Sequence, residues 1–540
     1  MTETPQKPRW WLLAAIVLVA LVAELIVWFS FSEDVTQQVL GTWVVVLVTF
    51  VLLLVWLLFL SRLPWKWRLI GLADIGLTLA ILLALFRYDG LAGDFTPLFS
   101  FRFSPDAEER AAALYESDTQ AASAVAASGE RLEIQPGDWP DFRGPNRDGH
   151  APGEVVRANW SDDPPQALWR RAVGPAWSSI IVVGDLLFTQ EQRGEQEAVV
   201  AYQADDGTEV WSHTNTARHD TFLGGLGPRA TPVLHDSRLY ALGATGILDC
   251  LDPLTGELHW SRDIAEDAGT AQLEFGFAGT PLVVGDLVVV NPGKNAPEGD
   301  DGSEDGKEPV DDGTPPGAVI AYDRLTGETV WKTGQRKAGY TAPRLETLDG
   351  VPQILVFSAW GLGGHDPASG EELWYFEWIN PYGTNSVQPI VTADGAVFIT
   401  TEATGSTLLD VRQVDGGWTV ESRWENSSFD LRFNGAVTDG ARVYGLDGGI
   451  LTAIDLATGE RAWKRGRYKF GQILLLRDHL LVLSETGKVA LVDLSAEGME
   501  ELASFEAVDG RSWNHPTVRD GILYVRSDRE MAAYDLRAAG

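Results

Sequence analysis

Cysteine and basic residues are scarce in this sequence, and each shortage excludes a class of structure or partner. The chain has 540 residues but only one cysteine, Cys250, so it cannot form an intramolecular disulfide, a CxxC redox pair or a multi-thiolate metal site. Lys and Arg total 42 against 76 Asp and Glu, which gives a net charge of −34. A phosphate polyanion would be repelled by such a protein, so DNA and RNA are set aside as partners.

Long apolar stretches are present near the N-terminus. Residues 10–31, 40–60 and 69–86 are each long enough to cross about 30 Å of hydrocarbon as a helix. We therefore expect residues 1–90 to form a membrane anchor of three transmembrane helices. A removable signal peptide is the alternative for the first stretch, but no small-residue cleavage site follows it and further apolar stretches do.

The charges around these stretches predict the orientation of the chain. Basic residues precede the first stretch and separate the second from the third, whereas the loop between the first and second carries only Glu33 and Asp34. By the positive-inside rule the N-terminus is cytoplasmic, and everything after the third stretch lies outside the cytoplasmic membrane, in the periplasm of a Gram-negative cell. The basic residues are Lys7, Arg9, Arg62, Lys66 and Arg68.

Two acidic residues, Glu24 and Asp74, fall inside the apolar stretches. Carboxylates within a membrane are functional candidates. In the predicted orientation Glu24 is nearer the outer end of its helix and Asp74 nearer the inner end of its own, so we do not expect them to meet. The alternative is that both are hydrated near opposite membrane surfaces.

Two segments read as connections rather than as packed structure. Residues 91–137 are predicted to be a helical or flexible linker, and residues 107–127 within it are rich in helix formers with little apolar stripe, which favours an exposed tether. Residues 291–317 are acidic and rich in Gly and Pro, and we expect a disordered loop there. A calcium loop is the alternative, but the spacing of the acids fits no EF-hand.

A nine-residue motif, Asp-x-x-Thr/Ser-Gly-x-x-x-Trp, recurs along the rest of the chain. The Asp side chain can accept backbone N–H bonds across a turn, and Gly permits the positive φ that closes it. The flanking residues alternate in hydrophobicity, so each copy predicts a hairpin of two strands. The copies are 252–260, 323–331, 366–374 and 455–463, with a weaker one at 203–211 that has Gln in place of Asp.

The tryptophans of this repeat predict the architecture. Repeats of about 40–50 residues are typical of propellers and solenoids. With Phe505 as a substitute there are eight positions, and each unit has about four strands, so we expect residues 138–540 to form an all-β, eight-bladed β-propeller closed by its N-terminal strand. Each indole is expected to pack between neighbouring blades. The seven docking tryptophans are Trp169, Trp211, Trp260, Trp331, Trp374, Trp424 and Trp463.

At these residues the chain resembles the PQQ-like (pyrroloquinoline-quinone-like) β-propellers, whose blades carry a tryptophan-docking repeat of the form Ala-x-Asp-x-x-Thr-Gly-x-x-x-Trp. The resemblance covers residues 138–540 and includes the lead-in Trp139-Pro-Asp-Phe-Arg-Gly-Pro145. It is specific for the fold and poor for function. The family includes quinoprotein dehydrogenases and the non-enzymatic lipoprotein of the outer-membrane barrel-assembly machinery. Resemblance to the dehydrogenases would imply PQQ and Ca²⁺ as cofactors of this chain.

The chain departs from both kinds of relative. The adjacent-cysteine disulfide of quinoprotein alcohol dehydrogenases cannot form, although similar membrane-bound glucose dehydrogenases do without it. The acylated N-terminal cysteine of the assembly lipoprotein is also missing, since Cys250 cannot serve. Anchorage is therefore expected to depend on the helices.

Candidate ligand-binding residues open the innermost strands, which line the axial channel of a propeller. Fixed cations with aromatic faces would suit a planar anion such as PQQ. The alternative is that the cations pair with nearby acids such as Asp430 and fill the channel structurally. The candidates are Trp177, Arg229, Tyr340, Asn385, Arg432, Asn434, Lys469, Trp513 and His515.

The preferred functional hypothesis is a membrane-anchored, exported, non-catalytic binding or scaffold module for an envelope protein partner or a small anionic ligand. The alternative is a PQQ-dependent dehydrogenase that oxidises an alcohol or sugar and passes electrons to membrane quinone. No catalytic residue can be assigned and no metal site is predicted. His213, His219 and His365 are expected to be solvated loop residues.

Overall fold

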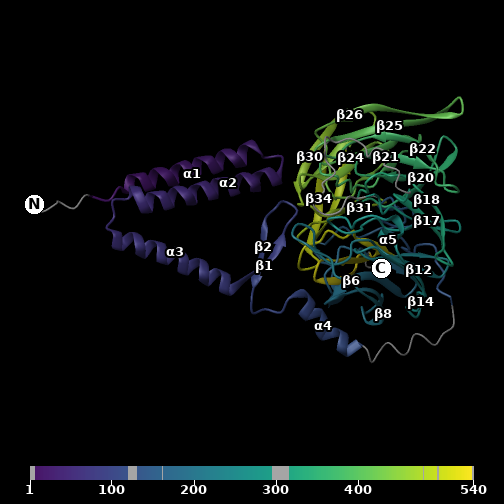
Figure 1. Cartoon of the computed structure of the whole chain (residues 1–540), viewed down its shortest axis with the longest axis horizontal. Coiled ribbons are helices and arrows are strands. Elements are labelled where there is room, and N and C mark those ends of the chain that lie inside the picture. Colours follow the sequence, from purple (N-terminus) through teal and green to yellow (C-terminus); the bar gives the residue numbers. More distant parts are fainter. Residues whose placement is uncertain are drawn as a thin grey trace, which may run out of the picture. The chain divides into compact units, whose positions relative to one another are not determined.

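Two compact units make up the chain, residues 1–105 and residues 106–540. The computed structural model describes residues 7–118, 131–160, 162–294, 316–477, 479–495 and 498–537, and Figure 1 labels their helices and strands. Most of the predicted acidic loop at 291–317, and residues 119–130 of the predicted linker, lie outside the described residues.

Three helices of the first unit are long and apolar enough to cross a membrane. The second begins earlier than its predicted span because the Asp34 carboxylate caps it, accepting a hydrogen bond from the backbone N–H of Gln37 at 3.1 Å. The third begins directly after Pro64, at a position where a missing N–H costs nothing. The elements are α1 (Trp10–Ser30), α2 (Val35–Val55), the π-helical turn η1 (Trp56–Leu60) and α3 (Trp65–Leu85).

The Glu24 side chain joins α1 to α2. Its carboxylate accepts hydrogen bonds from Trp28 Nε1 on its own helix at 2.7 Å and from Thr42 Oγ1 on α2 at 2.6 Å. The helices approach closely next to this contact, because a Cβ added to Gly41 would lie 2.6 Å from the Val27 side chain. Glu24 therefore has polar partners within the helix pair itself.

A two-stranded hairpin follows α3 directly. Strand β1 (Phe86–Leu91) pairs antiparallel with β2 (Pro97–Phe101). The sequence did not predict this hairpin, because the alternation of β1 begins where the apolar run of α3 ends and the two patterns merge.

The second unit is an eight-bladed β-propeller, as predicted, with four-stranded antiparallel blades. The first strands of neighbouring blades lie beside one another, so the first strand of each blade is the innermost. Blade 1 consists of β5 (Ile181–Val183), β6 (Leu186–Arg193), β7 (Gln196–Gln203) and β8 (Glu209–Thr216), and blade 2 of β11 (Val233–His235), β12 (Arg238–Leu242), β13 (Ile247–Leu251) and β14 (Leu258–Asp263). Blade 3 consists of β15 (Leu282–Val284), β16 (Leu287–Val290), β17 (Val319–Asp323) and β18 (Thr329–Thr333), and blade 4 of β19 (Arg344–Leu348), β20 (Val351–Phe357), β21 (Gly361–His365) and β22 (Glu372–Glu377).

The remaining blades follow the same order, and blade 7 gains a short parallel strand, β3 (His150–Ala151), beside its innermost strand. Blade 5 consists of β23 (Ile390–Val391), β24 (Val397–Thr401), β25 (Gly405–Val414) and β26 (Gly417–Asn426). Blade 6 consists of β27 (Val437–Thr438), β28 (Arg442–Asp447), β29 (Ile450–Asp455) and β30 (Arg461–Arg467). Blade 7 consists of β31 (Gln472–Leu476), β32 (Leu480–Leu483), β33 (Lys488–Ser495) and β34 (Gly498–Glu506).

The last blade is built from both ends of the propeller. Its first three strands are β35 (Thr517–Arg519), β36 (Ile522–Arg526) and β37 (Glu530–Asp535). The fourth is β4 (Ala167–Ala172), which pairs antiparallel with β37 and places Trp169 opposite Ala533. This confirms the predicted closure of the ring by its N-terminal strand.

The repeated motif forms the turn between the third and fourth strands of a blade. In blade 3 the Asp323 carboxylate accepts hydrogen bonds from the backbone N–H of Leu325 at 3.0 Å and of Thr326 at 2.8 Å, and from Thr326 Oγ1 at 3.0 Å. Gly327 closes the turn at a φ of 71°, which Gly adopts without strain. The same bonds recur at Asp252, Asp366 and Asp455.

Five of the seven docking indoles lie against the turn of the following blade. The Trp260 ring of blade 2 covers Gly327 of blade 3 so closely that a Cβ there would be 2.7 Å from the ring, and Trp260 Nε1 donates to the Arg324 carbonyl at 3.1 Å. The same arrangement holds for Trp169, Trp211, Trp331 and Trp424. Trp374 differs: blade 5 has a longer hairpin without the motif, and its indole donates to Gln353 within blade 4.

The helix predicted within the linker is not an exposed tether where the structure describes it. Helix α4 (Ala107–Asp118) packs on blade 1 and buries Ala111 completely. Its Glu108 carboxylate accepts hydrogen bonds from Arg218 at 3.1 Å and from the backbone N–H of Gly194 at 3.0 Å, and its Tyr115 ring lies under the Arg193 guanidinium at 3.7 Å. The helix packs largely through long polar side chains. Its sequence therefore shows no apolar stripe from which the packing could have been predicted.

We predict that Trp260→Ala destabilises the propeller by about 3–5 kcal/mol, because it leaves a cavity between blades 2 and 3 and removes the bond to Arg324. Thermal unfolding of the full chain in detergent, followed by near-UV circular dichroism, measures the effect. Leu325→Ala is the matched control, since that side chain is about half exposed in the same interface turn. Equal melting temperatures for the two variants would contradict the docking role of the indole.

Candidate functional site

The two faces of the propeller carry different connections. Strand direction alternates within a blade, so the motif turns and the turns between first and second strands lie on one face, which we call the turn face. The connections between blades lie on the other, which we call the mouth face. All nine candidate ligand residues precede an innermost strand, at the mouth-face end of the channel.

The candidate asparagines bind neighbouring backbone. Asn385 is completely buried; its Nδ2 donates to the Ser358 carbonyl at 2.7 Å and its Oδ1 accepts from Thr401 Oγ1. Asn434 Nδ2 donates to the Gly471 carbonyl at 2.6 Å, and Asn514 Nδ2 to the Ser178 carbonyl at 2.7 Å. These amides hold adjacent blades together around the axis.

Arg229 shapes a loop of the mouth face. Its guanidinium donates to the carbonyls of Phe275 at 2.9 Å and Gly225 at 2.7 Å, and also to Gly227. Burial, together with the nearby Arg511 charge, lowers its pKa to about 9. The loop that it holds contains the small hairpin of β9 (Asp220–Thr221) and β10 (Gly225–Leu226). Arg229 is thus committed to positioning backbone.

The other predicted cations also have local partners. Arg432 forms an ion pair with Glu402 at 2.8 Å and lies over the Phe470 ring, 5.1 Å from its centroid. Lys469, in the same connection as Phe470, adopts a positive φ of 56°. Tyr340 stands apart from this pair, against the ring of Phe275 at 5.6 Å.

The structure does bring two candidates together, Trp177 of blade 1 and Trp513 of blade 8. Their ring centroids are 4.4 Å apart, and the Arg511 guanidinium lies over both at 4.8 Å and 4.7 Å. Phe433 adds a third ring, 4.9 Å from Trp513, and Trp513 Nε1 donates to the Glu485 carboxylate at 2.8 Å. We call Trp177, Trp513, Phe433 and Arg511 the mouth cluster.

Arg511 is the functional candidate that sequence reasoning missed. Only 5% of its surface is exposed, and the Asp528 carboxylate lies 3.7 Å from its guanidinium. The only signal in the sequence was its position two residues before Trp513, which places both on the connection into β35. An Arg in a connection gives no indication that it stacks on two indoles from different blades.

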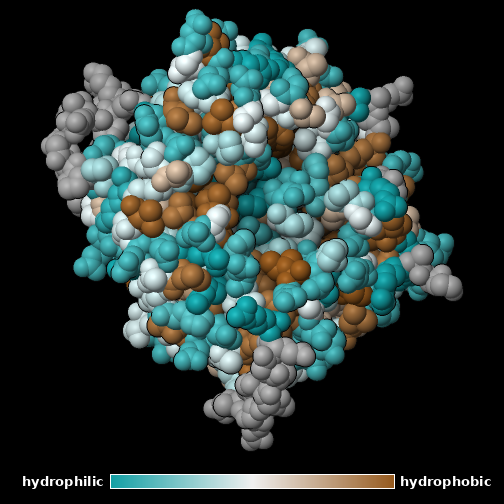
Figure 2. All heavy atoms as spheres, turned by 90° about the vertical axis from the view of Figure 1, so that its right-hand side faces the viewer, coloured by the Kyte–Doolittle hydropathy of each residue, from teal (hydrophilic) through white to brown (hydrophobic). Residues whose placement is uncertain are grey.

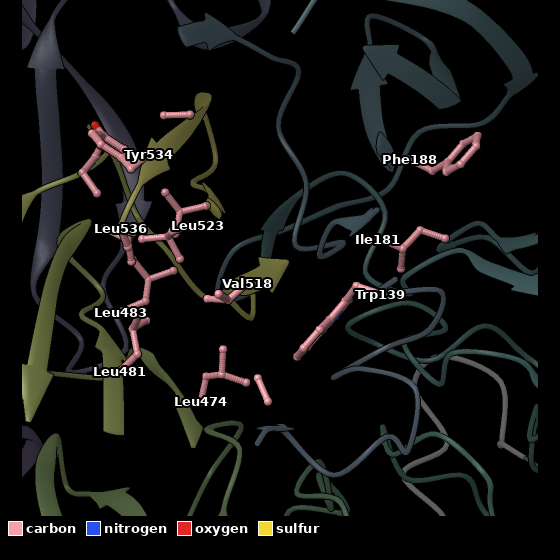
Figure 3. Packing of buried hydrophobic residues seen from close by; sticks show 14 of the residues in the cluster. Trp139, Ile181, Phe188, Leu474, Leu481, Leu483, Val518, Leu523, Tyr534 and Leu536 are labelled. Carbon is pink, nitrogen blue, oxygen red and sulfur yellow. The ribbon is translucent and has the colours of Figure 1, made fainter. Parts of the chain in front are cut away.

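The lead-in segment, residues 138–151, fills the other end of the channel. Trp139 bonds Val182 of the innermost strand of blade 1 through both backbone groups, at 2.8 Å and 2.9 Å. Its ring is 4% exposed, and Figure 3 shows it between Ile181, Val518 and Leu474, which belong to blades 1, 8 and 7. The sequence identified this segment by resemblance but did not show that it is a plug.

Two buried arginines of the plug reach further blades. Arg147 Nη2 donates to the carbonyls of Thr280 at 3.1 Å and Pro281 at 3.2 Å in blade 3, and Arg143 donates to the Ala436 carbonyl at blade 6. Burial lowers the pKa of Arg143 to about 10. Together these contacts connect the plug to blades on opposite sides of the ring.

His515 faces the plug. Its ring meets the Phe142 ring edge to face at 5.1 Å, and burial, aided by the nearby Arg143 charge, holds its pKa well below the usual value. A neutral imidazole in this position adds no positive charge to the mouth. The predicted channel candidate His515 therefore belongs to the boundary between the plug and the inner strands.

The histidines expected in solvent lie in packed surroundings. His219 and His365 are both buried, and burial lowers the pKa of each to about 4. His213 is on β8 with its Nε2 3.3 Å from the Asp249 carboxylate. Solvation was the wrong expectation because alternating strands, not loops, carry two of them. Within the described residues, no group of three His, Cys, Asp or Glu could hold a metal ion.

The residues at the mouth do not fit PQQ with Ca²⁺. A planar ring between two indoles needs about 7 Å between them, since each contact takes about 3.5 Å, whereas Trp177 and Trp513 stack directly at 4.4 Å. Of the buried asparagines, Asn385 already accepts a hydrogen bond from Thr401 through its Oδ1, and within the described residues no group of three His, Cys, Asp or Glu could complete a metal site.

A buried carboxyl group next to the Arg229 loop generates a pH prediction. Glu197 is 5% exposed, and burial raises its pKa to about 7, although the backbone N–H of Ala244 donates to it at 3.2 Å. The folded chain therefore holds a proton that the unfolded chain loses above about pH 4.5. Wild-type stability should fall relative to Glu197→Gln as pH rises from about 4.5 to 7, by at most about 3 kcal/mol. Urea unfolding of both chains at about pH 5 and pH 7.5 tests this, and a constant difference would contradict it.

Comparisons with known proteins agree with this geometry at the level of the fold. Quinohemoprotein alcohol dehydrogenase from Comamonas testosteroni is 13% identical with a TM-score of 0.55, covering 80% of this chain and 84% of that one. Quinohemoprotein alcohol dehydrogenase ADHIIG from Pseudomonas putida HK5 is 14% identical with a TM-score of 0.52, covering 75% and 81%. BamB from Moraxella catarrhalis is 15% identical with a TM-score of 0.48, covering 69% and 99%.

No curated protein matches the chain. A family model does, the PQQ_2 model described as "Outer membrane protein assembly factor BamB", over residues 159–296 and 195–465. These matches span more than half of the sequence and include all seven docking tryptophans. The chain belongs to this family of PQQ-like β-propellers.

Proposed function

We propose that the protein is a membrane-anchored, non-catalytic binding or scaffold module whose propeller lies on the outer side of the cytoplasmic membrane. Its mouth face would hold a protein partner of the cell envelope or a small anionic ligand. The observation that carries the proposal is the mouth cluster, in which two indoles lie under one guanidinium and a third ring packs on Trp513, at the mouth-face end of the channel.

The chemistry of the mouth cluster supports binding rather than catalysis. Trp177, Trp513 and Phe433 are partly exposed and offer a rigid aromatic surface of the kind typical of interaction hot spots. The buried Arg511 lies against the two indoles and braces them. On the face drawn in Figure 2, hydrophilic side chains predominate and hydrophobic ones are scattered among them.

Two exposed aromatic residues extend this surface on neighbouring connections of the mouth face. Phe222 is 70% exposed at the tip of the β9–β10 hairpin, and Tyr382 is 64% exposed between β22 and β23. The Phe222 loop is joined to the mouth cluster, since Trp177 Nε1 donates to the Gly224 carbonyl at 2.6 Å. A protein partner could therefore contact the loop tips and the cluster together.

The location follows from the helices and their charges. Three membrane-crossing helices with basic residues at the predicted inner ends favour a cytoplasmic N-terminus and an exported propeller. Residues 1–90 carry six acidic and six basic groups, so all of the excess acid belongs to the chain beyond the helices. In a Gram-negative cell this compartment is the periplasm.

Photo-crosslinking tests the mouth face as the partner surface. A photoreactive phenylalanine analogue placed at Phe222 or Tyr382 should give discrete adducts in native membranes, and adding Trp513→Ala should reduce them by removing the centre of the mouth cluster. The same analogue at Leu258 or Leu325 is the matched control, because these residues are about half exposed in motif turns on the turn face. Equal adducts from both faces would contradict the proposal.

A cofactor experiment separates the proposal from the alternative of a PQQ-dependent dehydrogenase. The purified full chain is incubated with PQQ and Ca²⁺ and assayed for retained cofactor and for alcohol- or sugar-dependent dye reduction. We expect neither, because the stacked indoles leave no slot for the ring. Retained PQQ with substrate-dependent reduction would establish the dehydrogenase and overturn the scaffold.

A further inference from the structure

The hairpin β1–β2 is fastened to the end of α3. Strand β1 begins at Phe86, the residue after the last residue of α3. The backbone N–H of Arg102, just beyond β2, donates to the Leu85 carbonyl at 2.7 Å, and its guanidinium donates to the Leu83 carbonyl at 2.9 Å. These bonds satisfy carbonyls that a helix end leaves unpaired, so the hairpin continues α3 in a fixed direction.

One face of this hairpin is aromatic. Phe86 lies opposite Phe101 and Tyr88 opposite Phe99, with ring centroids 6.2 Å and 6.0 Å apart, and Phe103 packs on Phe101 at 5.4 Å. All five side chains are exposed, from 40% for Phe86 to 72% for Phe103. A contiguous exposed patch of aromatic rings marks an interaction surface.

The opposite face is polar. Arg87 donates to Ser100 Oγ at 2.8 Å and lies 3.3 Å from the Asp89 carboxylate. Because side chains alternate along a strand, this face points away from the aromatic one. The hairpin is therefore amphipathic across its thickness, with an ion pair on one side and rings on the other.

Physical constraints place such a hairpin at a membrane surface. A two-stranded hairpin is marginal in water by itself, and each Phe left in water forgoes the favourable burial of its ring. The polar face carries the Arg87–Asp89 ion pair, which would be costly to place in the hydrocarbon core, so the hairpin as a whole does not suit that region. The interface offers an apolar boundary for rings and water or headgroups for backbone, and aromatic residues concentrate there.

The distribution of aromatic residues along α3 supports the same location. Its predicted inner end begins with Trp65 and Trp67, both exposed, next to the basic residues Lys66 and Arg68. Its last two turns, residues 78–85, contain no aromatic residue. The outer end of α3 thus lacks an aromatic anchor of its own, and the hairpin that follows supplies five rings.

We propose that the aromatic face of β1–β2 lies in the outer interface of the bilayer as a lipid-binding anchor, with its polar face toward water. The proposal rests on the membrane anchoring given under the proposed function. It assigns to this hairpin a lipid surface as its partner, and it requires no particular ligand of the propeller.

Spin-label depth measurements test the proposal on the full chain in nanodiscs. The natural Cys250 is completely buried and burial raises its pKa to about 11, so the wild-type chain serves as the labelling blank. Phe99→Cys and Phe101→Cys probe the aromatic face, Ser100→Cys is the matched control on the polar face, and Leu79→Cys, an exposed position of α3, reports the membrane core. Accessibility to oxygen is compared with accessibility to a water-soluble nickel chelate.

We expect labels at residues 99 and 101 to show a several-fold higher ratio of oxygen to chelate accessibility than the label at residue 100, and a ratio below that at residue 79. Equal, water-like ratios at 99, 100 and 101 with a lipid-like ratio at 79 would overturn the hairpin proposal alone. A water-like ratio at residue 79 would overturn the membrane anchoring, and the hairpin proposal with it. Two probes on the aromatic face guard against one substitution that disturbs the hairpin.

Discussion

The fold depends on one recurring contact, an indole of one blade lying on the turn glycine of the next. The contact works because glycine has no Cβ at the point where the ring approaches, as at Gly327 under Trp260. It combines apolar burial with a hydrogen bond from the indole Nε1 to a turn carbonyl, so it fixes both the distance and the angle between neighbouring sheets. Ring closure through β4 then makes the contacts mutually dependent.

The two ends of the propeller channel are built from different side chains. The plug uses Trp139, Arg143 and Arg147 to join blades that share no strand pairing, and its donors satisfy inner-strand carbonyls. At the mouth face the corresponding side chains are the indoles of Trp177 and Trp513 and the guanidinium of Arg511 that lies over them. In this propeller Trp177 and Trp513 lie 4.4 Å apart at the mouth, which is too close to admit a planar ring between them.

The architecture was predictable because it repeats. Together with Phe505, the tryptophans from Trp169 to Trp463 predict eight blades. The first unit has only a last strand and the final unit stops before its fourth, which predicts the closure of the ring. The site was less predictable because its contacts join residues far apart in the chain: nothing local distinguishes Asn385, which binds backbone, from an asparagine that faces a ligand. Arg511 and the plug were missed for the same reason, and the β1–β2 hairpin because its strand pattern merges with the preceding helix.

The construction of blade 8 has a consequence for biogenesis. Since β4 is synthesised about 360 residues before β37 by their numbering, the N-terminal edge must wait, unpaired, until the rest of the ring has been synthesised. Exposed edges of this kind are prone to wrong pairing. Slow synthesis would lengthen that wait, so the rate at which the chain emerges, and not only its sequence, bears on how many chains reach the closed ring.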